Sequence, residues 1–480
     1  MAPSAADVLS LYDNAPLTPR YWATLVLIYA QAAFEFFDYF LVGYLVAVLA
    51  GPWHLTYGQS AIMLLSAGIG AIIGSIVWGR LADAWGRKRL LVLGSLIYPV
   101  AAGCLALIPD GAWVLFAALR FLVGLGMAGA ITSQVPLLVE VTPTRHRPVV
   151  TGGMVIPVAL GVLLAALSAA TLLDLIGWRG IAALGALPLL SALAIALIVP
   201  ESVRWLLAHN RFEEARAIVA GWLHRPVASI SIPTARPLEA PKAPFRELYR
   251  NKVRFWQITA IWTAHTTVSY CVVLWAPTIL ALRLDIPVKE AAHYYEFVAI
   301  AGILGRTLFT FMPLWTGRRV AGMLMGYIGA VGLLAAGLFN GAFIGPLPAF
   351  IVILVATMFF FDGGVSNNAP YSAEIFPVQL MGRATGLAQA CNGVGKILGP
   401  LILAMIAGSS NLISPKATTD AVLPAFIVMA ICSLVCALAY TLVPTERSRA
   451  PLMLSLADEE GLASATGARG FASAPSRRPR

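Results

Sequence analysis

The stretch GRLADAWGRKR, residues 79–89, decides how the rest of the sequence is interpreted. It places four basic residues and one acid, Asp83, between two of the most apolar segments of the chain, near 58–79 and 90–108. A bilayer-spanning helix needs about 20 mostly apolar residues, and basic residues gather in the loops on one side of a membrane. The pattern therefore predicts a helical membrane protein with many spans.

The composition indicates the same class. The chain has 480 residues, of which 59% are hydrophobic and 12% charged, whereas a soluble domain is about one-quarter charged. Its mean hydropathy is +0.81. The net charge of +10 comes from basic loops between apolar segments, so it indicates topology and not nucleic-acid binding. The cysteines show no metal-ligand spacing, and no phosphate-binding or catalytic motif stands out. We therefore expect no cofactor, no metal site and no enzymatic activity.

Twelve apolar segments fall into two sets of six. We expect an all-α membrane protein with twelve transmembrane helices in two pseudo-symmetric six-helix bundles. The expected parts are a cytoplasmic N-terminal segment (1–20), an N-terminal bundle (21–199), a cytoplasmic linker (200–253), a C-terminal bundle (254–444) and a disordered tail (445–480). The segments lie near 21–49, 58–79, 90–108, 112–140, 149–173, 180–199, 254–282, 288–312, 319–340, 347–373, 382–408 and 422–444.

Basic residues predict the orientation. The loops after even-numbered segments hold most of the Lys and Arg, whereas the loops near 50–57, 109–111 and 341–346 hold none. The even-numbered loops and both termini are therefore predicted to be cytoplasmic, in the inner membrane of a bacterium. Between Glu201 and Trp222, apolar residues recur at helical spacing. This predicts short amphipathic helices at the membrane surface, with a plain linker as the alternative.

The two halves repeat short motifs. LVEVTPTRHRPVVTGG from Leu138 and SAEIFPVQLMGRATG from Ser372 each place E-x-x-P at a helix end, followed by an Arg and then T-G. GRKR at Gly86 recurs as GRR at Gly317. Internal repeats of this kind are typical of a secondary transporter whose substrate site lies between the halves near the membrane centre.

These motifs resemble those of the major facilitator superfamily, over nearly the whole chain. GRLADAWGRKR is similar to its loop 2–3 signature, and PESVRWLL (200–207) is similar to the mid-chain motif of its sugar-porter-like members. RFLVGLGMAG (120–129) and AEIFPVQLMGRATG (373–386) fit the same group. FEFFDYFLVGYLV (34–46) and LWAPTIL (274–280) resemble metabolite:proton and aromatic-acid:proton symporters. Hexose porters differ in the seventh and tenth helices, where this chain has HTTVSY and Ala369.

The resemblance implies a cytoplasmic gate, which is the set of contacts that closes the cytoplasmic side. It implies that Asp83 docks at the N-terminus of the eleventh helix, where backbone N–H groups attract an anion, and that Arg87 bridges towards Glu140. The alternative is that the cations only set topology. The second half has Leu314 in place of the acid, so a symmetric second gate is not expected unless Glu374 and Arg383 compensate. The residues assigned to the gate are Gly79, Asp83, Gly86, Arg87, Glu140, Arg147, Glu201, Arg204, Glu374 and Arg383.

Charges inside apolar segments indicate function, because a central charge costs roughly 2.5–3.5 kcal/mol. Glu35 and Asp38 lie on the first helix and Arg120 on the fourth. Counted at 1.5 Å per residue from the outer helix ends, Asp38 is about 16 Å deep and Arg120 about 12 Å deep, so the two can meet. The resemblance implies that Asp38 carries the proton and that Arg120 is its partner. A static ion pair is the alternative, and Glu35 is either a second protonatable group or a packing residue.

Two further charges lie in the second half, Asp362 and Lys396. Lys396 either pairs with a substrate carboxylate or forms an ion pair with Asp362, and the sequence favours neither. Gly363 and Gly364 are expected to bend the tenth helix. The other candidates for substrate binding are each equally suited to hydrogen-bonding a neighbouring helix, and they are Gln134, Trp262, His265, Tyr270, Asn367, Asn368, Tyr371, Gln389 and Asn392.

These observations favour a proton-coupled symporter that takes up a small organic anion, a carboxylate with or without an aromatic ring, by alternating access. A sugar or polyol porter is the alternative within transporters, and a non-transporting membrane sensor is the alternative from another class. The expected partners are the substrate, protons and the lipid bilayer, with the protein as a monomer and no nucleic acid bound.

Overall fold

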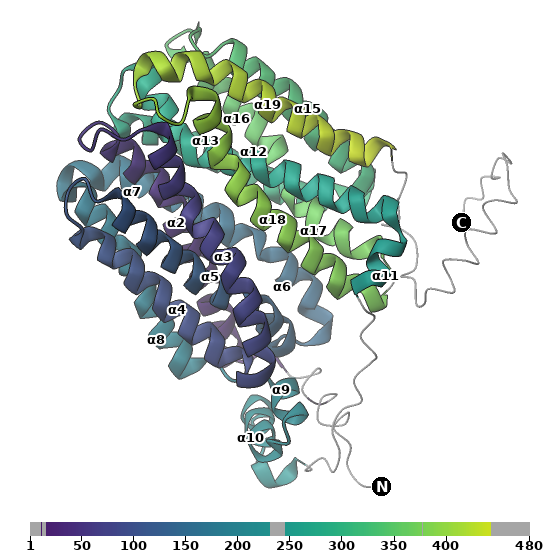
Figure 1. The fold of residues 1–480 in the computed structure, drawn as a ribbon. Coiled ribbons are helices and arrows are strands. Elements are labelled where there is room, and N and C mark those ends of the chain that lie inside the picture. Colours follow the sequence, from purple (N-terminus) through teal and green to yellow (C-terminus); the bar gives the residue numbers. More distant parts are fainter. Residues whose placement is uncertain (1–10, 12–15, 231–244, 377, 443–480) are drawn as a thin grey trace, which may run out of the picture.

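The computed structural model describes residue 11 and residues 16–230, 245–376 and 378–442, and helices make up most of this part of the chain. The first half holds α2 (Pro19–Leu49), α3 (Tyr57–Trp85), α4 (Arg87–Cys104), α5 (Trp113–Val141), α6 (Arg147–Gly153), α7 (Val155–Ala183) and α8 (Pro188–Ile198). The second half holds α12 (Lys252–Leu284), α13 (Val288–Phe311), α14 (Pro313–Thr316), α15 (Arg318–Leu338), α16 (Ala349–Phe361), α17 (Val365–Glu374), α18 (Val378–Ala407) and α19 (Pro415–Leu442). In Figure 1 the purple and blue first half lies beside the green and yellow second half.

Smaller elements connect these helices. Between the halves lie α9 (Val203–Ala208), α10 (Phe212–Leu223) and α11 (Phe245–Arg250). Short 3₁₀ turns occupy Leu105–Leu107, Thr144–His146, Leu184–Ala186 and Val227–Ser229, and a two-stranded ribbon pairs β1 (Phe343–Ile344) with β2 (Leu347–Pro348). α9 and α10 lie in the part of the linker where the apolar spacing predicted short helices. Their apolar faces, with Trp205 and Trp222, pack against Tyr21 and the neighbouring core of the first half.

Eleven helical segments of the described chain are long and apolar enough to cross a membrane. One of them, Val150–Ile198, has 49 residues, which is about 74 Å of helix against a hydrocarbon core of about 30 Å. Gly177 interrupts it with a left-handed φ of 64°. This interruption falls between the segments expected at 149–173 and 180–199, which explains why one candidate span covers both.

Caps and glycines set the ends of the helices that enter the functional region. Thr18 caps α2 by accepting from Tyr21 N, and Thr56 forms a capping box with Gln59 at the start of α3. α3 ends at Gly86 (φ 99°), and α14 ends at Gly317 (φ 83°). Such positive φ values favour glycine. The repeated GRKR and GRR motifs therefore mark the same sharp turn in both halves.

The end of the molecule that carries these two turns is called the basic end here, and the opposite end is called the far end. The halves meet mainly along three helix pairs, namely α2 with α12, α3 with α18 and α7 with α13. At the far end, three contacts join the halves. Thr56 and Leu412 form an isolated β-bridge, the Tyr57 and Thr418 hydroxyls lie 2.5 Å apart, and Lys289 Nζ lies 2.7 Å from Asp174 Oδ2.

The halves separate towards the basic end along α3 and α18. A Cβ atom added at Gly393 would lie 2.8 Å from Ile72 Cγ1, so the two helices touch there. One helical turn closer to the basic end, Ser75 on α3 and Gln389 on α18 are exposed, although they continue the contacting faces of their helices. The structure is therefore closed at the far end and open between α3 and α18 at the basic end.

Candidate functional site

Asp38 and Arg120 form a buried ion pair inside the first half. Arg120 on α5 uses Nη1 to donate to Asp38 Oδ2 at 2.7 Å. The expected meeting of the two side chains is confirmed. Arg120 Nε and Nη2 are buried without a hydrogen-bond partner in the described chain. Most buried polar groups in proteins have a hydrogen-bond partner. Because Asp38 is held through Nη1 alone, the other two guanidinium nitrogens are available to bind a different acceptor.

Glu35 lies one turn away on the same face of α2 and is also buried. Its Oε1 accepts a hydrogen bond from Gln134 Nε2 on α5. Its Oε2 has no partner among the described residues. No cation of the described chain lies within ion-pair distance of Glu35, unlike Asp38. The first helix therefore carries two buried carboxyl groups, of which one is paired with a cation and one is not.

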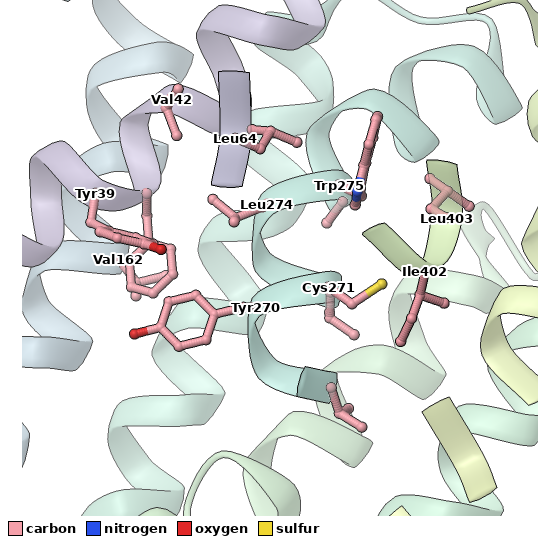
Figure 2. Packing of buried hydrophobic residues seen from close by; sticks show 14 of the residues in the cluster. Tyr39, Val42, Leu64, Val162, Tyr270, Cys271, Leu274, Trp275, Ile402 and Leu403 are labelled. Atoms are coloured by element: carbon pink, nitrogen blue, oxygen red, sulfur yellow. The ribbon is translucent and has the colours of Figure 1, made fainter. Parts of the chain in front are cut away.

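Lys396 lies where the two halves meet. It is 9% exposed, and a Cβ atom added at Gly68 on α3 would lie 3.2 Å from its Cβ. Its Nζ lies 5.1 Å from the ring centroid of Tyr39, on α2, and 5.5 Å from that of Tyr270, on α12. These distances are in the range of cation–π attraction. Figure 2 shows Tyr39 and Tyr270 next to each other within the packed core between the halves.

Asp362 does not pair with Lys396, so that alternative is wrong. Its carboxylate accepts two hydrogen bonds from Arg306 on α13, from Nε to Oδ2 at 2.9 Å and from Nη2 to Oδ1 at 2.9 Å. Lys396 has no carboxylate of the described residues within ion-pair distance of its Nζ. The bidentate geometry explains the choice, because a planar guanidinium matches a carboxylate better than an ammonium group does.

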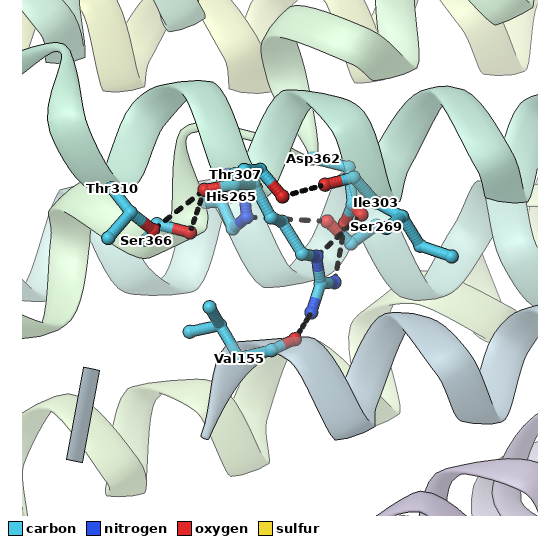
Figure 3. Close-up of polar contacts among 9 residues, drawn as sticks. Val155, His265, Ser269, Ile303, Thr307, Thr310, Asp362 and Ser366 are labelled. Atoms are coloured by element: carbon cyan, nitrogen blue, oxygen red, sulfur yellow. Dashed lines mark hydrogen bonds and ion pairs between the residues drawn. The ribbon is translucent and has the colours of Figure 1, made fainter. Parts of the chain in front are cut away.

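Sequence reasoning missed Arg306. It is the one Lys or Arg in the stretch from 290 to 317, within GILGRTLF, and a lone cation in a membrane span is a functional candidate by itself. Its third nitrogen, Nη1, donates to the carbonyl oxygen of Val155 on α7 at 3.1 Å. Val155 belongs to the first half, so this arginine reaches across the molecule. Figure 3 shows Asp362 and Val155 joined by dashed lines to the same guanidinium group.

The tenth apolar segment, in which the glycines predicted a bend, is interrupted by a turn that separates α16 from α17. α16 ends at Phe361 and α17 begins at Val365, with Asp362, Gly363 and Gly364 between them. A Cβ atom added at Gly363 would lie 2.7 Å from the backbone of Gly305. Asp362 therefore sits at a helix break that packs closely against α13.

Several substrate-binding candidates join the helices of the second half. Trp262 Nε1 donates to Ser372 Oγ at 2.8 Å. The Asn368 side-chain oxygen accepts from the Tyr440 hydroxyl at 2.8 Å. Two other contacts of this group run from Asn367 Nδ2 to the Arg318 carbonyl at 2.9 Å and from Gln257 Nε2 to the Tyr371 hydroxyl at 2.7 Å.

The other candidates are scattered. His265 stacks on Phe361 with centroids 4.6 Å apart, and its Nδ1 is buried without a partner in the described chain. Asn392 Nδ2 lies 3.3 Å from Gln389 Oε1 on the exposed part of α18. The structure thus brings Tyr270 and Lys396 together, and it leaves Gln389 and Asn392 nearer the basic end.

At the basic end, the gate residues of the first half lie together. Arg87 Nε lies 4.0 Å from Glu140 Oε1. Glu201 Oε1 accepts a hydrogen bond from the Lys88 backbone N–H at 2.9 Å, at the first turn of α4. A Cβ atom added at Gly86 would meet this carboxylate, and the φ of 99° at Gly86 itself favours glycine.

The second half has an ion pair at the equivalent turn. Arg318, directly after Gly317, donates from Nε and Nη2 to Glu374 at 2.6 and 2.7 Å. Glu374 therefore pairs with Arg318, while Arg383 is exposed. The acid missing at Leu314 does not prevent an arginine–glutamate pair equivalent to Arg87 and Glu140.

Four other gate candidates have different contacts, are exposed or are not described. Arg147 Nε donates to the carbonyl oxygens of Val139 and Thr142 at 2.9 and 3.0 Å. Gly79 and Arg204 are exposed, and Gly79 has open space around it. The side chain of Asp83 lies outside the described part of the structure, so its docking remains a prediction.

The chain matches the model of the Major Facilitator Superfamily over residues 28–343 and 316–460. It therefore belongs to this superfamily, as its motifs predicted. The members are transporters and not enzymes. The fold is the helical fold of the superfamily, and the protein is a multi-pass membrane transporter.

Curated relatives extend over most of the chain. The niacin transporter NiaP of Acinetobacter baylyi is 26% identical over 408 residues, which cover 83% of this chain and 90% of the relative. The 4-hydroxybenzoate transporter PcaK of Pseudomonas aeruginosa is 26% identical over 422 residues, which cover 84% and 90%. A gallate transporter of Pseudomonas putida is 26% identical over 428 residues, which cover 88% and 93%.

Solved structures share the fold. The crystal structure of a D-xylose–proton symporter superposes with a TM-score of 0.67 at 18% identity, over 87% of this chain and 97% of that one. The inward-open xylose transporter XylE from E. coli gives a TM-score of 0.67 at 18% identity, over 92% and 99%. At these identities the likeness shows the fold alone.

Proposed function

We propose that this protein is a proton-coupled symporter that imports a small carboxylate, with an aromatic acid as the preferred substrate. The observation that carries the proposal is Lys396, a nearly buried cation between the two halves whose Nζ has no carboxylate of the described residues within ion-pair distance. Its aromatic neighbours, Tyr39 and Tyr270, suit a planar ring beside the carboxylate. Relatives named for niacin, 4-hydroxybenzoate and gallate transport support this substrate class.

The basic end is the cytoplasmic end in this proposal. The positive-inside rule supports that orientation, with both termini cytoplasmic and twelve spans, two of which lie within Val150–Ile198. The structure then corresponds to an inward-facing carrier, because it is closed at the far end. A carboxylate released from Lys396 leaves past Gln389 and Asn392 on α18.

Proton coupling rests on Asp38 and Arg120 in this proposal. A buried carboxylate costs energy unless a cation or hydrogen bonds compensate it. Arg120 holds Asp38 through one nitrogen and has two buried donors unused. When Asp38 takes a proton, Arg120 is released towards another acceptor. When Arg120 returns, its charge favours the carboxylate form of Asp38, which then releases the proton. Glu35, which has no cation of the described chain within ion-pair distance, is suited to a second protonatable position.

The gate residues at the basic end hold the cytoplasmic side closed when the carrier faces outward. Arg87 with Glu140 and Arg318 with Glu374 anchor the equivalent turns of the two halves. The remaining assignments, including docking of Asp83 at the start of α18, are part of the same proposal.

Uptake into proteoliposomes tests the function. Protein would be reconstituted with an imposed proton gradient, acidic outside, and supplied with radiolabelled nicotinate, 4-hydroxybenzoate or xylose. We expect accumulation of at least one aromatic acid above the equilibrium level, and loss of accumulation with a protonophore. Equilibration that ignores the gradient would leave a facilitator, and accumulation of xylose alone would overturn the choice of substrate class.

A further inference from the structure

Arg306 connects two helix breaks that belong to different halves of the molecule. On one side it holds Asp362, which lies between α16 and α17. On the other side it donates to Val155, the first residue of α7, directly after the break that separates α7 from α6. All three guanidinium nitrogens are used, and the side chain is buried.

The two contacts differ in how they respond to movement. The ion pair with Asp362 lies within the second half, and α13 packs on the tenth segment so closely that Gly305 and Gly363 have no room for a Cβ atom. Arg306 and Asp362 therefore move together as one body. The bond to Val155 crosses between the halves, and a relative displacement of about 1 Å takes a 3.1 Å hydrogen bond outside normal geometry.

We propose that Arg306 is a positioning residue that ties the helix break of the second half to the first half, and that its bond to Val155 stabilises the state open at the basic end. The ion pair with Asp362 orients the guanidinium so that Nη1 points at the Val155 carbonyl. When the halves rock, this bond breaks and Arg306 travels with Asp362. The inference rests on alternating access within the proposed function, but not on the identity of the substrate.

The test reads the conformation directly and needs no substrate. In a background without the native cysteines, Gln389→Cys reports exposure between α3 and α18, and Thr418→Cys, at a buried far-end contact, reports opening of the far end. Reaction of each with N-ethylmaleimide in proteoliposomes gives a ratio of two labelling rates. This ratio follows the balance between the two states.

The central variant is Arg306→Leu combined with Asp362→Leu. It removes the cross-half bond without leaving a buried unpaired charge, which single variants would do. We expect Gln389→Cys labelling to fall and Thr418→Cys labelling to rise, with about a tenfold change in their ratio, the size set by one charged hydrogen bond. Arg306→Lys should shift the ratio in the same direction, because one ammonium group cannot hold both partners.

The matched control is Arg179→Leu combined with Asp110→Leu. This exposed ion pair joins parts of the first half only, with Arg179 Nη2 2.9 Å from Asp110 Oδ1, and its loss should leave the ratio unchanged. Size-exclusion chromatography establishes whether each variant is folded. If the double variant is not folded, the labelling ratio of Arg306→Lys provides the test. A folded Arg306 variant with the wild-type ratio, or with a shift equal to the control's, would overturn the inference. Because no substrate is used, this failure is separate from a failure of uptake.

Discussion

The ion pairs of the two halves differ in what they can reach. Asp38 and Arg120 are enclosed in the first half, held by one short contact, with two guanidinium nitrogens unused. Asp362 and Arg306 are held by two contacts, and the third nitrogen of Arg306 binds the other half. An incompletely satisfied pair is suited to exchanging a proton, whereas a fully satisfied pair is suited to holding a position. The two halves therefore contain similar Asp–Arg ion pairs that are suited to different roles.

The largest expected effect comes from Asp38→Asn. Asparagine keeps an oxygen that can accept from Arg120 but cannot bind and release a proton. We expect gradient-driven accumulation of an aromatic acid to fall to the level of empty liposomes, while exchange of labelled for unlabelled substrate continues. Both are measured by uptake in proteoliposomes.

A matched control for this change is Asp110→Asn, an exposed acid at the far end. It should accumulate substrate like the wild type. Asp38→Asn should also keep the wild-type ratio of Gln389→Cys to Thr418→Cys labelling. That result would separate the role of Asp38 from the positioning role of Arg306. Accumulation that survives in Asp38→Asn would remove Asp38 as the proton carrier.

Lys396→Gln is expected to have the next largest effect, on substrate binding. Its ammonium group has no carboxylate partner in the described chain, so we expect it to bind the carboxylate of the substrate. Loss of one charged hydrogen bond, roughly 1.5–3 kcal/mol, raises the dissociation constant by about 10- to 100-fold. Thermal-shift titration with 4-hydroxybenzoate measures this.

Lys396→Arg should retain most of the affinity, since the charge remains. Lys416→Gln removes an exposed lysine at the start of α19 and should leave binding unchanged. Wild-type affinity in Lys396→Gln would show that the lysine is held by its aromatic neighbours for structural reasons.

The sequence predicted the class of fold because apolar length and basic loops leave few alternatives in a membrane. It also predicted the meeting of Asp38 with Arg120, since both positions follow from counting along straight helices. It could not choose a partner for Asp362, because that choice depends on which face of α13 meets the break after α16. The tight packing at Gly305 and Gly363 sets that face. It places Arg306, and not Lys396, next to the Asp362 carboxylate.

Both halves contain glycines at which two helices approach closely, and substitution of such a glycine should have a smaller effect, on stability. A Cβ atom at Gly305 would lie 1.9 Å from the Phe359 carbonyl oxygen, and one at Gly124 would lie 1.8 Å from that of Ala67. Gly305→Ala should therefore lower stability by about 1–3 kcal/mol, seen as a lower unfolding temperature in detergent. Gly386→Ala is the control, because open space surrounds Gly386 and alanine favours the helix. Equal stability of the two variants would contradict the close approach of α13 to α16.

The smallest effect distinguishes the two basic-end ion pairs. Arg318 holds Glu374 with two bonds of 2.6 and 2.7 Å, whereas Arg87 lies 4.0 Å from Glu140. Both pairs are partly exposed, so each contributes at most about 1 kcal/mol, and bidentate geometry favours the first. Glu374→Gln should lower the unfolding temperature by more than Glu140→Gln does. The difference should shrink in 1 M salt, where the screening length is about 3 Å. A larger loss for Glu140→Gln would mean that the first half, and not the second, has the stronger anchor at its basic turn.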